Sequence, residues 1–340
     1  MGEEFLNRVY KTREIQAEEN KKETDEIEQG VRQMIETILG RLKENRPVFD
    51  VAAIIPTGSF YEGTKVGAPQ EFDFMLTLDK LSKPDRITLH PGCSVWYPYI
   101  KVQPGVEFPQ EFMFNMFYDG EHKDKDFLGS PRILVQEFWK EIEKVLDSLR
   151  KSSFELKMRQ GTMSLVPCES RKLQFLYQHK FEYESGLPEK YDAEREKSLY
   201  LVRCLYIDVD LMLAIDHPFV ESVLHMAGFP KHFEELLRKH KCHVIPKSCH
   251  KDHMAQKHCW FVTFSSIERE VVSKMDLHHK KCYKILKSLI SSDISISRKC
   301  MNLSSYTLKT AFLFHVYGET QGTGCSNSKT LSTCIMDVLN

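Results

Sequence analysis

Two strand-like segments carry acidic side chains on one face and apolar side chains on the other. The first reads EFDFMLTL from Glu71 to Leu78, and the second reads LYIDVDLMLAI over residues 205–215. Because successive side chains of a strand point to opposite faces, Glu71 and Asp73 share one face while the phenylalanines beside them face a core. Asp208 and Asp210 share a face of the second segment in the same way. An acid within such apolar strands is costly unless it is paired or metal-bound, so the pattern predicts a sheet with one buried face and one acidic face.

The acidic face indicates a particular chemistry. Neighbouring carboxylates repel each other, and a site that keeps both commonly holds a divalent cation. Acids on neighbouring strands fit a two-metal nucleotidyl-transfer site, and the turn at Gly58-Ser59 upstream is small enough to approach a phosphate closely. The alternative is a chance pair of acids on a solvent-facing strand. The Gly-Ser turn and the second strand, with Asp210, favour the catalytic interpretation.

The composition excludes several other classes of protein. The chain has 340 residues, 41% of them hydrophobic, and a net charge of −1, which is typical of a globular protein with one bilobed unit or two domains. No apolar run approaches the length of a membrane span, and the charged N-terminus lacks the apolar core of a signal peptide. Ten scattered cysteines are interpreted as reduced thiols. We therefore expect a cytoplasmic protein without a membrane span, in which nucleic-acid binding requires a local basic patch.

The spacing of apolar residues predicts the order of elements. A helix is expected from residue 3 to about 46, because apolar residues recur at helical spacing between Ile27 and Leu42 before Pro47. Strands are expected to about residue 80 and again up to 215, on either side of a mixed segment and a helix at about 131–150. Further helices are expected at 230–240, 264–275, 278–291 and 302–317. The order is a helix, a mixed α/β lobe and a helical lobe.

Five segments together carry a family resemblance. They are GSFYEGTKVGAPQEFDFML, VDLMLAI, WFVTFSSIEREVV, CYKILKSL and LSSYTLKTAFLFHV. In this order they resemble the cyclic GMP–AMP synthase (cGAS)-like receptor and male-abnormal (Mab)-like family of the nucleotidyltransferase superfamily, from about residue 10 to residue 317. The resemblance implies an α+β, bilobed nucleotidyltransferase fold with a mixed β-sheet catalytic lobe, a long N-terminal spine helix and a helical C-terminal lobe. The implied domains are a catalytic lobe at 1–215, a helical lobe at 216–317 and an atypical tail at 318–340 that suggests a truncated form.

The resemblance also implies an activity. Members of the family are nucleic-acid-activated enzymes that join two nucleoside triphosphates, such as ATP and GTP, into a cyclic dinucleotide for innate immune signalling. Matching positions imply that Glu71, Asp73 and Asp210 hold Mg²⁺ or Mn²⁺ in a two-metal mechanism. Gly58 and Ser59 are then expected to contact phosphate.

The resemblance implies nucleotide contacts from the helical lobe as well. The matching positions are Ser265, Lys287, Ser305 and Tyr306, with the Tyr306 ring stacked on a base and Lys309 as a weaker candidate. A helix-core role for Tyr306 and a solvated lysine at position 287 are the alternatives.

Three features depart from the family pattern. Phe261 follows the tryptophan where relatives often carry a nucleotide-contacting arginine, so the identity of the product stays open. The segment SKMDLHHKKC offers His278, His279 and Cys282, which are too few for the zinc thumb of the DNA-sensing member. The polar tail does not resemble the last helices of the family, and their loss is expected to expose apolar surface.

The segment 240–259 is rich in histidine, cysteine and lysine. Candidate zinc ligands there are Cys249, His253, His258 and Cys259, but their spacing matches no closed template, so a structural zinc is disfavoured and an exposed basic loop is favoured. Basic residues outnumber acidic ones over 228–259, and Lys247, Lys251 and Lys257 are predicted to bind a nucleic-acid backbone. Without a zinc thumb, double-stranded RNA is favoured over DNA as the activator.

Two other functions stay open. One is a catalytically silent family member that acts as a binding or developmental protein; the tail favours it, and the intact acids disfavour it. The other is a nucleotidyltransferase that extends RNA tails, which the helical-lobe segments disfavour.

Overall fold

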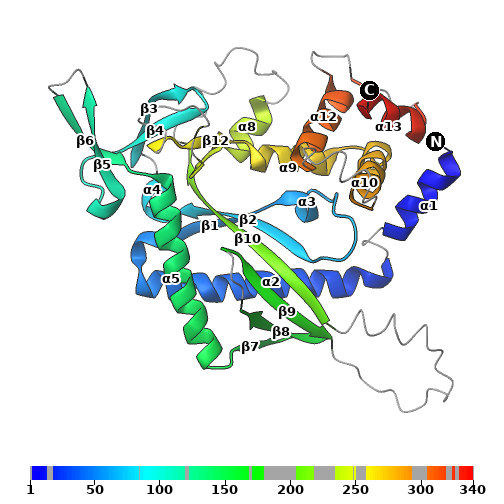
Figure 1. Cartoon of the computed structure of the whole chain (residues 1–340), viewed down its shortest axis with the longest axis horizontal. Coiled ribbons are helices and arrows are strands. Elements are labelled where there is room, and N and C mark those ends of the chain that lie inside the picture. Colours follow the sequence, from blue (N-terminus) through cyan, green and yellow to red (C-terminus); the bar gives the residue numbers. More distant parts are fainter. Residues whose placement is uncertain are drawn as a thin grey trace.

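A computed structural model describes most of the chain (Figure 1). The described residues are 2–13, 18–83, 85–118, 122–167, 171–179, 204–217, 234–247, 249, 258–292, 305–318, 324–325 and 329–339. The fold is α+β, as predicted, with a curled mixed sheet at its centre and helices around it.

The central sheet is organised around its longest strand, β10 (Cys204–Asp216). In the order β1-β2-β10-β9-β8-β7 the other strands are β1 (Val51–Thr57), β2 (Glu71–Leu78), β9 (Leu173–His179), β8 (Gly161–Val166) and β7 (Glu155–Lys157). β10 is parallel to β2 and antiparallel to β9. It also pairs with β11 (His243–Ile245), which in turn pairs with β12 (Phe261–Thr263). Segments far apart in the sequence therefore meet on β10.

Two long helices cover the apolar face of this sheet. They are α2 (Glu18–Asn45) and α5 (Pro131–Lys151), and their apolar side chains form one cluster with Phe72 and Phe74 of β2 (Figure 1). The predicted apolar stripe of α2, from Ile27 to Leu42, is buried throughout. The spine helix was predicted as one helix from residue 3; the structure has α1 (Glu3–Arg13) and α2, and residues 14–17 lie outside the described part.

A smaller sheet and short connecting helices complete this part of the fold. The sheet has the order β3-β4-β6-β5, from β3 (Ile87–Ser94), β4 (Tyr97–Val102), β6 (His122–Leu128) and β5 (Met113–Tyr118). The short helices are η1 (Pro47–Phe49), α3 (Gly58–Tyr61), α4 (Asp79–Ser82) and η2 (Gln110–Phe112). The strands β3 to β6 and η2 lie in the region, residues 81–130, where the sequence showed turn signals among aromatic strand-like pieces.

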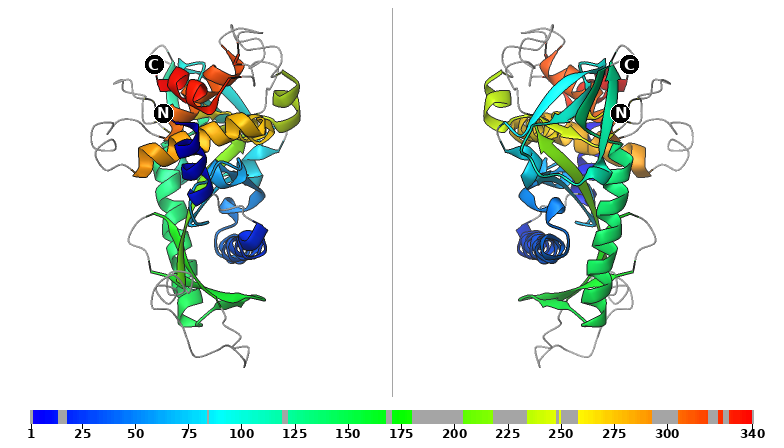
Figure 2. Two further views of the ribbon diagram at one scale, coloured as in Figure 1. Left: turned by 90° about the vertical axis from the view of Figure 1, so that its right-hand side faces the viewer. Right: turned by 90° about the vertical axis from the view of Figure 1, so that its left-hand side faces the viewer.

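The described helices of the second half match the predicted ranges; residues 230–233 and 302–304 of those ranges lie outside the described part. They are α8 (Glu234–His240), α9 (Ser265–Lys274), α10 (Leu277–Ser292) and α12 (Ser305–Tyr317). A further helix, α13 (Leu331–Leu339), lies in the tail that was expected to be polar and atypical. It buries Leu331, Cys334 and Ile335 in one apolar cluster with α10, α12 and Leu6 of α1. Figures 1 and 2 show the two ends of the chain side by side there.

The described ranges contain no helix that combines the length and the apolar character needed to cross a bilayer.

Candidate active site

Three carboxylates converge on the acidic face of the central sheet. The parallel register sets Asp73 of β2 beside Asp210 of β10, and Glu71 beside Asp208. One carboxylate oxygen from each of Glu71, Asp73 and Asp210 lies within 4.8 Å of the others. The structure therefore brings together the three acids singled out in the sequence. Asp208 takes another role, because its Oδ1 accepts a hydrogen bond of 2.9 Å from Gln174 Nε2.

The remaining residues on the acidic face of β2 are buried. Met75 and Thr77 follow Asp73 on the same side of β2, and both are buried. Met75 packs with Ala214 of β10 and Ile245 of β11. The acids are therefore confined to one end of the paired strands, where Glu71 is exposed and Asp73 is half-buried.

The charges in this cluster perturb one another. Burial, and then the negative charges of Glu71 and Asp210, raise the pKa of Asp73 from 3.8 to about 6. Lys65 donates a hydrogen bond of 2.8 Å to Glu71 Oε2 and thereby lowers the pKa of Glu71. Lys172 Nζ lies 3.4 Å from Asp210 Oδ1, and that negative charge raises the pKa of Lys172. Two ammonium groups thus compensate part of the negative charge of the cluster.

Gly58 brings the backbone up against Asp73. It opens α3 directly after β1, with a φ of +75° that side-chain-bearing residues rarely adopt. A Cβ built at this position meets Asp73 Oδ2 at 1.9 Å. Both the dihedral angle and the space therefore require glycine. Ser59 follows in the same turn, so the structure places the Gly-Ser pair next to the acid cluster.

The predicted nucleotide contacts come from three helices. Ser265 begins α9, Lys287 lies in α10, and Ser305 and Tyr306 begin α12. Burial and then the positive charge of Lys65 lower the pKa of Lys287. The negative charge of Glu71 raises it, so the ammonium of Lys287 interacts electrostatically with the acid cluster. Tyr306 is 60% exposed, and a helix-core role for its ring is therefore wrong. Ser265 Oγ lies 2.8 Å from Thr263 Oγ1.

Lys309 links α12 to the ends of two other elements, Glu62 after α3 and Glu268 in α9. Its Nζ lies 2.9 Å from Glu62 Oε1 and 3.0 Å from Glu268 Oε2, and it sits 5.6 Å from the centre of the Tyr306 ring. The two carboxylates outweigh the effect of burial and raise the pKa of Lys309. Lys309 therefore fixes the start of α12, and with it Tyr306, relative to α3 and α9.

Sequence reasoning missed Lys65, Lys172 and Glu62. Lys65 and Glu62 stand between the Gly-Ser turn and the acid pair, but their spacing follows no strand or helix period that would mark them. Lys172 precedes β9, and only the pairing of β9 with β10 brings it near Asp210.

The histidine- and cysteine-rich segment is arranged differently from the predicted zinc set. Cys249 and Cys259 both approach Cys93 of β3, with Sγ–Sγ distances of 3.1 and 2.6 Å. His258 instead stacks on Phe114, with ring centres 3.9 Å apart. His253 lies outside the described residues.

Of the predicted basic patch, the structure describes only Lys247. Its side chain is exposed, with Nζ 5.4 Å from the centre of the Phe261 ring. Lys251 and Lys257 lie outside the described residues.

The chain is similar to known synthases over most of its length. It is 23% identical over 336 residues to cyclic GMP-AMP synthase of Sus scrofa, covering 92% of this chain and 58% of that protein. It is 22% identical over 341 residues to the same enzyme of Mus musculus, covering 94% and 58%. It is 24% identical over 255 residues to a cyclic GMP-AMP synthase-like receptor of Magallana gigas, covering 69% and 35%.

The chain thus spans little more than half the length of the mammalian relatives it matches. No protein-family model matches it. The similarities support a cGAS-like family assignment.

Proposed function

We propose that this cGAS-like chain is a nucleotidyltransferase that joins two nucleoside triphosphates, such as ATP and GTP, into a cyclic dinucleotide for innate immune signalling. The observation that carries the proposal is the convergence of Glu71, Asp73 and Asp210 beside the glycine backbone at position 58. Similarity to synthases over more than nine-tenths of the chain supports it.

The three acids fit a divalent cation, Mg²⁺ or Mn²⁺. Hard cations prefer carboxylate oxygens. Burial, and then the negative charges of Glu71 and Asp210, raise the pKa of Asp73, and a divalent charge at this position stabilises the ionised carboxylate. When bound, such an ion polarises phosphoryl oxygens and activates a hydroxyl for attack on phosphorus. Lys65 and Lys172 pair with Glu71 and Asp210, and Gly58 leaves room for the Asp73 carboxylate.

The helical lobe binds and orients the nucleotides in this proposal. The exposed Tyr306 ring offers a stacking surface for a base, and Lys309 holds it in place through Glu62. The ammonium of Lys287 attracts phosphate toward the acids, and the hydroxyls of Ser265, Ser305 and Ser59 are the polar contacts proposed around it. The domains proposed are a catalytic lobe at 1–215, a helical lobe at 216–317 and a tail at 318–340.

Activation by nucleic acid in the cytoplasm belongs to the same proposal. Double-stranded RNA is the activator we favour, bound at the patch of Lys247, Lys251 and Lys257. Contacts of this kind neutralise phosphates and release counterions, so binding is expected to weaken steeply with salt.

A catalytically silent binding protein is the second candidate. The ion pairs Lys65–Glu71 and Lys172–Asp210 favour it, because they compensate two of the acids without a metal.

A nucleotide-incorporation assay separates the two. Purified chain is mixed with labelled nucleoside triphosphates and Mg²⁺ or Mn²⁺, with no activator, double-stranded RNA or double-stranded DNA. We expect a phosphatase-resistant small product that is lost in Asp210→Asn. Asp208→Asn is the matched control, since this acid lies on the same face of β10 but is bonded to Gln174. No product from folded protein under any condition refutes the enzymatic proposal and favours the binding protein.

A further inference from the structure

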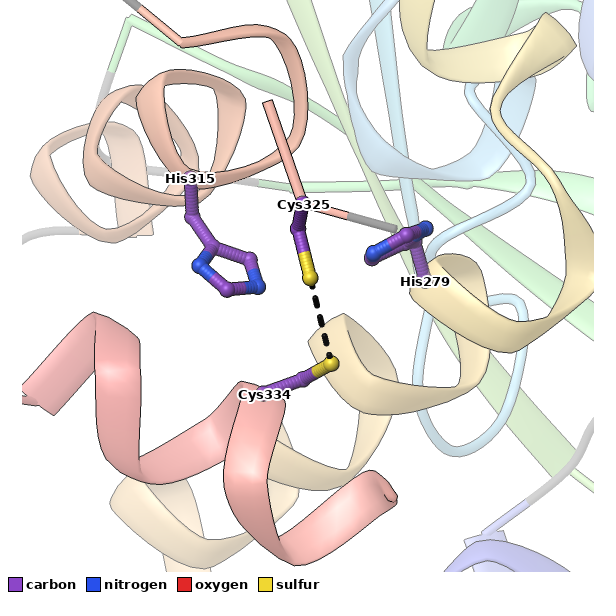
Figure 3. A group of neighbouring side chains, drawn as sticks. All are labelled: His279, His315, Cys325 and Cys334. Carbon is purple, nitrogen blue, oxygen red and sulfur yellow. Dashed lines mark hydrogen bonds between the residues drawn. The ribbon is translucent and has the colours of Figure 1, made fainter. Parts of the chain in front are cut away.

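Two histidines and two cysteines converge in the helical lobe, away from the acid cluster. They are His279 of α10, His315 of α12, Cys325 and Cys334 of α13 (Figure 3). One ligand atom from each lies within 4.8 Å of the others, and Figure 3 shows the rings and sulfurs around a common centre. His279 and Cys334 are fully buried. The tertiary structure alone creates this set, because its members come from separate elements.

His279 is held by the acid that caps its own helix. Asp276 precedes α10, and its Oδ1 accepts a hydrogen bond of 3.0 Å from the backbone N–H of His279. Its Oδ2 lies 2.6 Å from His279 Nδ1, which donates to the carboxylate. The lone pair of the neutral ring then lies on Nε2. A carboxylate behind a histidine is the arrangement that orients metal-binding imidazoles.

Cys325 is held against the end of α12. Its backbone N–H donates a hydrogen bond of 3.0 Å to the carbonyl of His315. The preceding residue, Gly324, packs so closely that a Cβ there meets the carbonyl oxygen of Val316 at 2.2 Å. Cys325 and His315 are therefore fixed to each other through the backbone.

The dimensions suit a tetrahedral zinc ion. Cys325 Sγ and Cys334 Sγ are 3.7 Å apart, and two sulfurs on a tetrahedral ion at about 2.3 Å are separated by roughly 3.8 Å. Within the described part of the chain, Nε2 of His279 and Nε2 of His315 are buried without a hydrogen-bond partner. Such buried nitrogens are costly unless something binds them, and two thiolates with two imidazoles are a zinc-type ligand set.

We propose that His279, His315, Cys325 and Cys334 bind one structural zinc ion. The ion ties α13 to α10 and α12 and fixes the last described helix of the chain. The ion also stabilises the position of α1 indirectly, because Glu3 Oε1 of α1 accepts a hydrogen bond of 2.9 Å from the backbone N–H of Ser332 in α13. The site is independent of the nucleotidyltransferase activity, and it is neither the disfavoured set at 249–259 nor the family's thumb.

Three other arrangements of the nearby cysteines and histidines compete with this zinc site. His278 Nε2 lies 3.5 Å from Cys334 Sγ, and with Cys282 these residues form a three-ligand group. Cys93, Cys249 and Cys259 form another. A disulfide between Cys325 and Cys334 is the third arrangement.

The test is the zinc content of the full chain, purified from zinc-supplemented cells and measured by mass spectrometry of the metal. We expect about one zinc per chain from this site, lost in Cys325→Ser and in His315→Asn. The matched controls His278→Asn and Cys204→Ser keep it; Cys204 is exposed and outside the groups above. Asp276→Asn, which preserves the helix cap, is expected to weaken zinc affinity by about 10- to 100-fold.

A second measurement uses the unmodified sequence and does not depend on the folding of a variant. Alkylation of Cys325 is compared with and without a chelator, and chelation is expected to accelerate it. Cobalt substitution is expected to give thiolate-to-metal charge transfer. Three results overturn the proposal: zinc-free protein from supplemented cells, zinc that depends on Cys93 but not on Cys325, and a Cys325–Cys334 disulfide in zinc-containing protein.

Discussion

Replacing Gly58 with alanine tests whether the turn and the acid cluster form one unit. The φ of +75° at this position costs an alanine about 1–2 kcal/mol of stability. A separate cost arises because the new Cβ lies 1.9 Å from Asp73 Oδ2, whereas real Cβ contacts essentially never fall below 3.0 Å. The carboxylate of Asp73 therefore has to move by about 1 Å, and displacements on that scale at catalytic sites cost about 100-fold in rate.

Gly63→Ala is the matched control for the stability cost of placing alanine at a positive φ. Gly63 has a φ of +70°, but a Cβ there has no neighbour within 4 Å. Both variants are expected to lose a similar free energy of unfolding from the dihedral angle. Only Gly58→Ala is expected to lose product formation by about 100-fold and to bind Mn²⁺ more weakly than the parent chain.

The measurements are urea unfolding, Mn²⁺ titration and the nucleotide-incorporation assay on the three proteins. If Gly58→Ala binds Mn²⁺ and makes product as well as Gly63→Ala, the Asp73 carboxylate does not depend on the glycine and the reasoning is refuted. Loss of product without weaker Mn²⁺ binding would instead indicate that Gly58 acts by contacting the nucleotide phosphate and not by positioning Asp73.

Three further predictions concern other parts of the fold. Lys309→Gln leaves Glu62 buried without its cation and is expected to cost about 3 kcal/mol in urea unfolding, whereas Lys329→Gln, on an exposed ion pair, costs little. Tyr306→Ala is expected to raise KM for the stacked nucleotide by about 5- to 150-fold with unchanged unfolding, and Tyr306→Phe to leave KM near the parent value. Burial lowers the pKa of His217 from 6.5 to about 4, so between these values the unfolded chain binds a proton that the folded chain does not. The free energy of unfolding should therefore fall by about 3 kcal/mol as the pH drops through this window, and His217→Asn should flatten the slope; an unchanged slope contradicts the assignment.

Periodicity predicted the elements whose environment is uniform along their length. The stripe of α2 from Ile27 to Leu42 faces a single sheet, so one period describes it completely. The acid face of β2 was predictable only in its first half. Met75 is covered by Ile245 of β11, a strand that pairs with β10 from far along the chain, and no local pattern contains that information.

The helix in the tail was not predicted, for a different reason. Leu331, Cys334, Ile335 and Val338 have helical spacing, but the helix is short and follows a polar stretch. Isolated helices of this length are marginal, and α13 is stabilised instead by packing on α10 and α12. Tertiary contacts, which a single sequence does not display, decide its structure.

The candidate site was predictable where the acids repeat along a strand, as at Glu71 and Asp73. The compensating lysines at 65 and 172 were not, because a lysine in a loop shows no period. The cluster around His279 and Cys334 was also out of reach, since its members are spread over α10, α12 and α13.

The parallel pairing of β2 with β10 has a consequence for how the chain acquires its site. All of β3 to β9 lies between the two strands in the sequence, so closing this pair requires a loop of high contact order. Pairings of that kind form slowly, because the entropy of closure must be overcome before the contacts stabilise it. During synthesis, a nascent chain that has completed β2 still lacks Asp210. The acids therefore meet only after most of the lobe has been translated, and intermediates before that point present β2 with an unpaired edge.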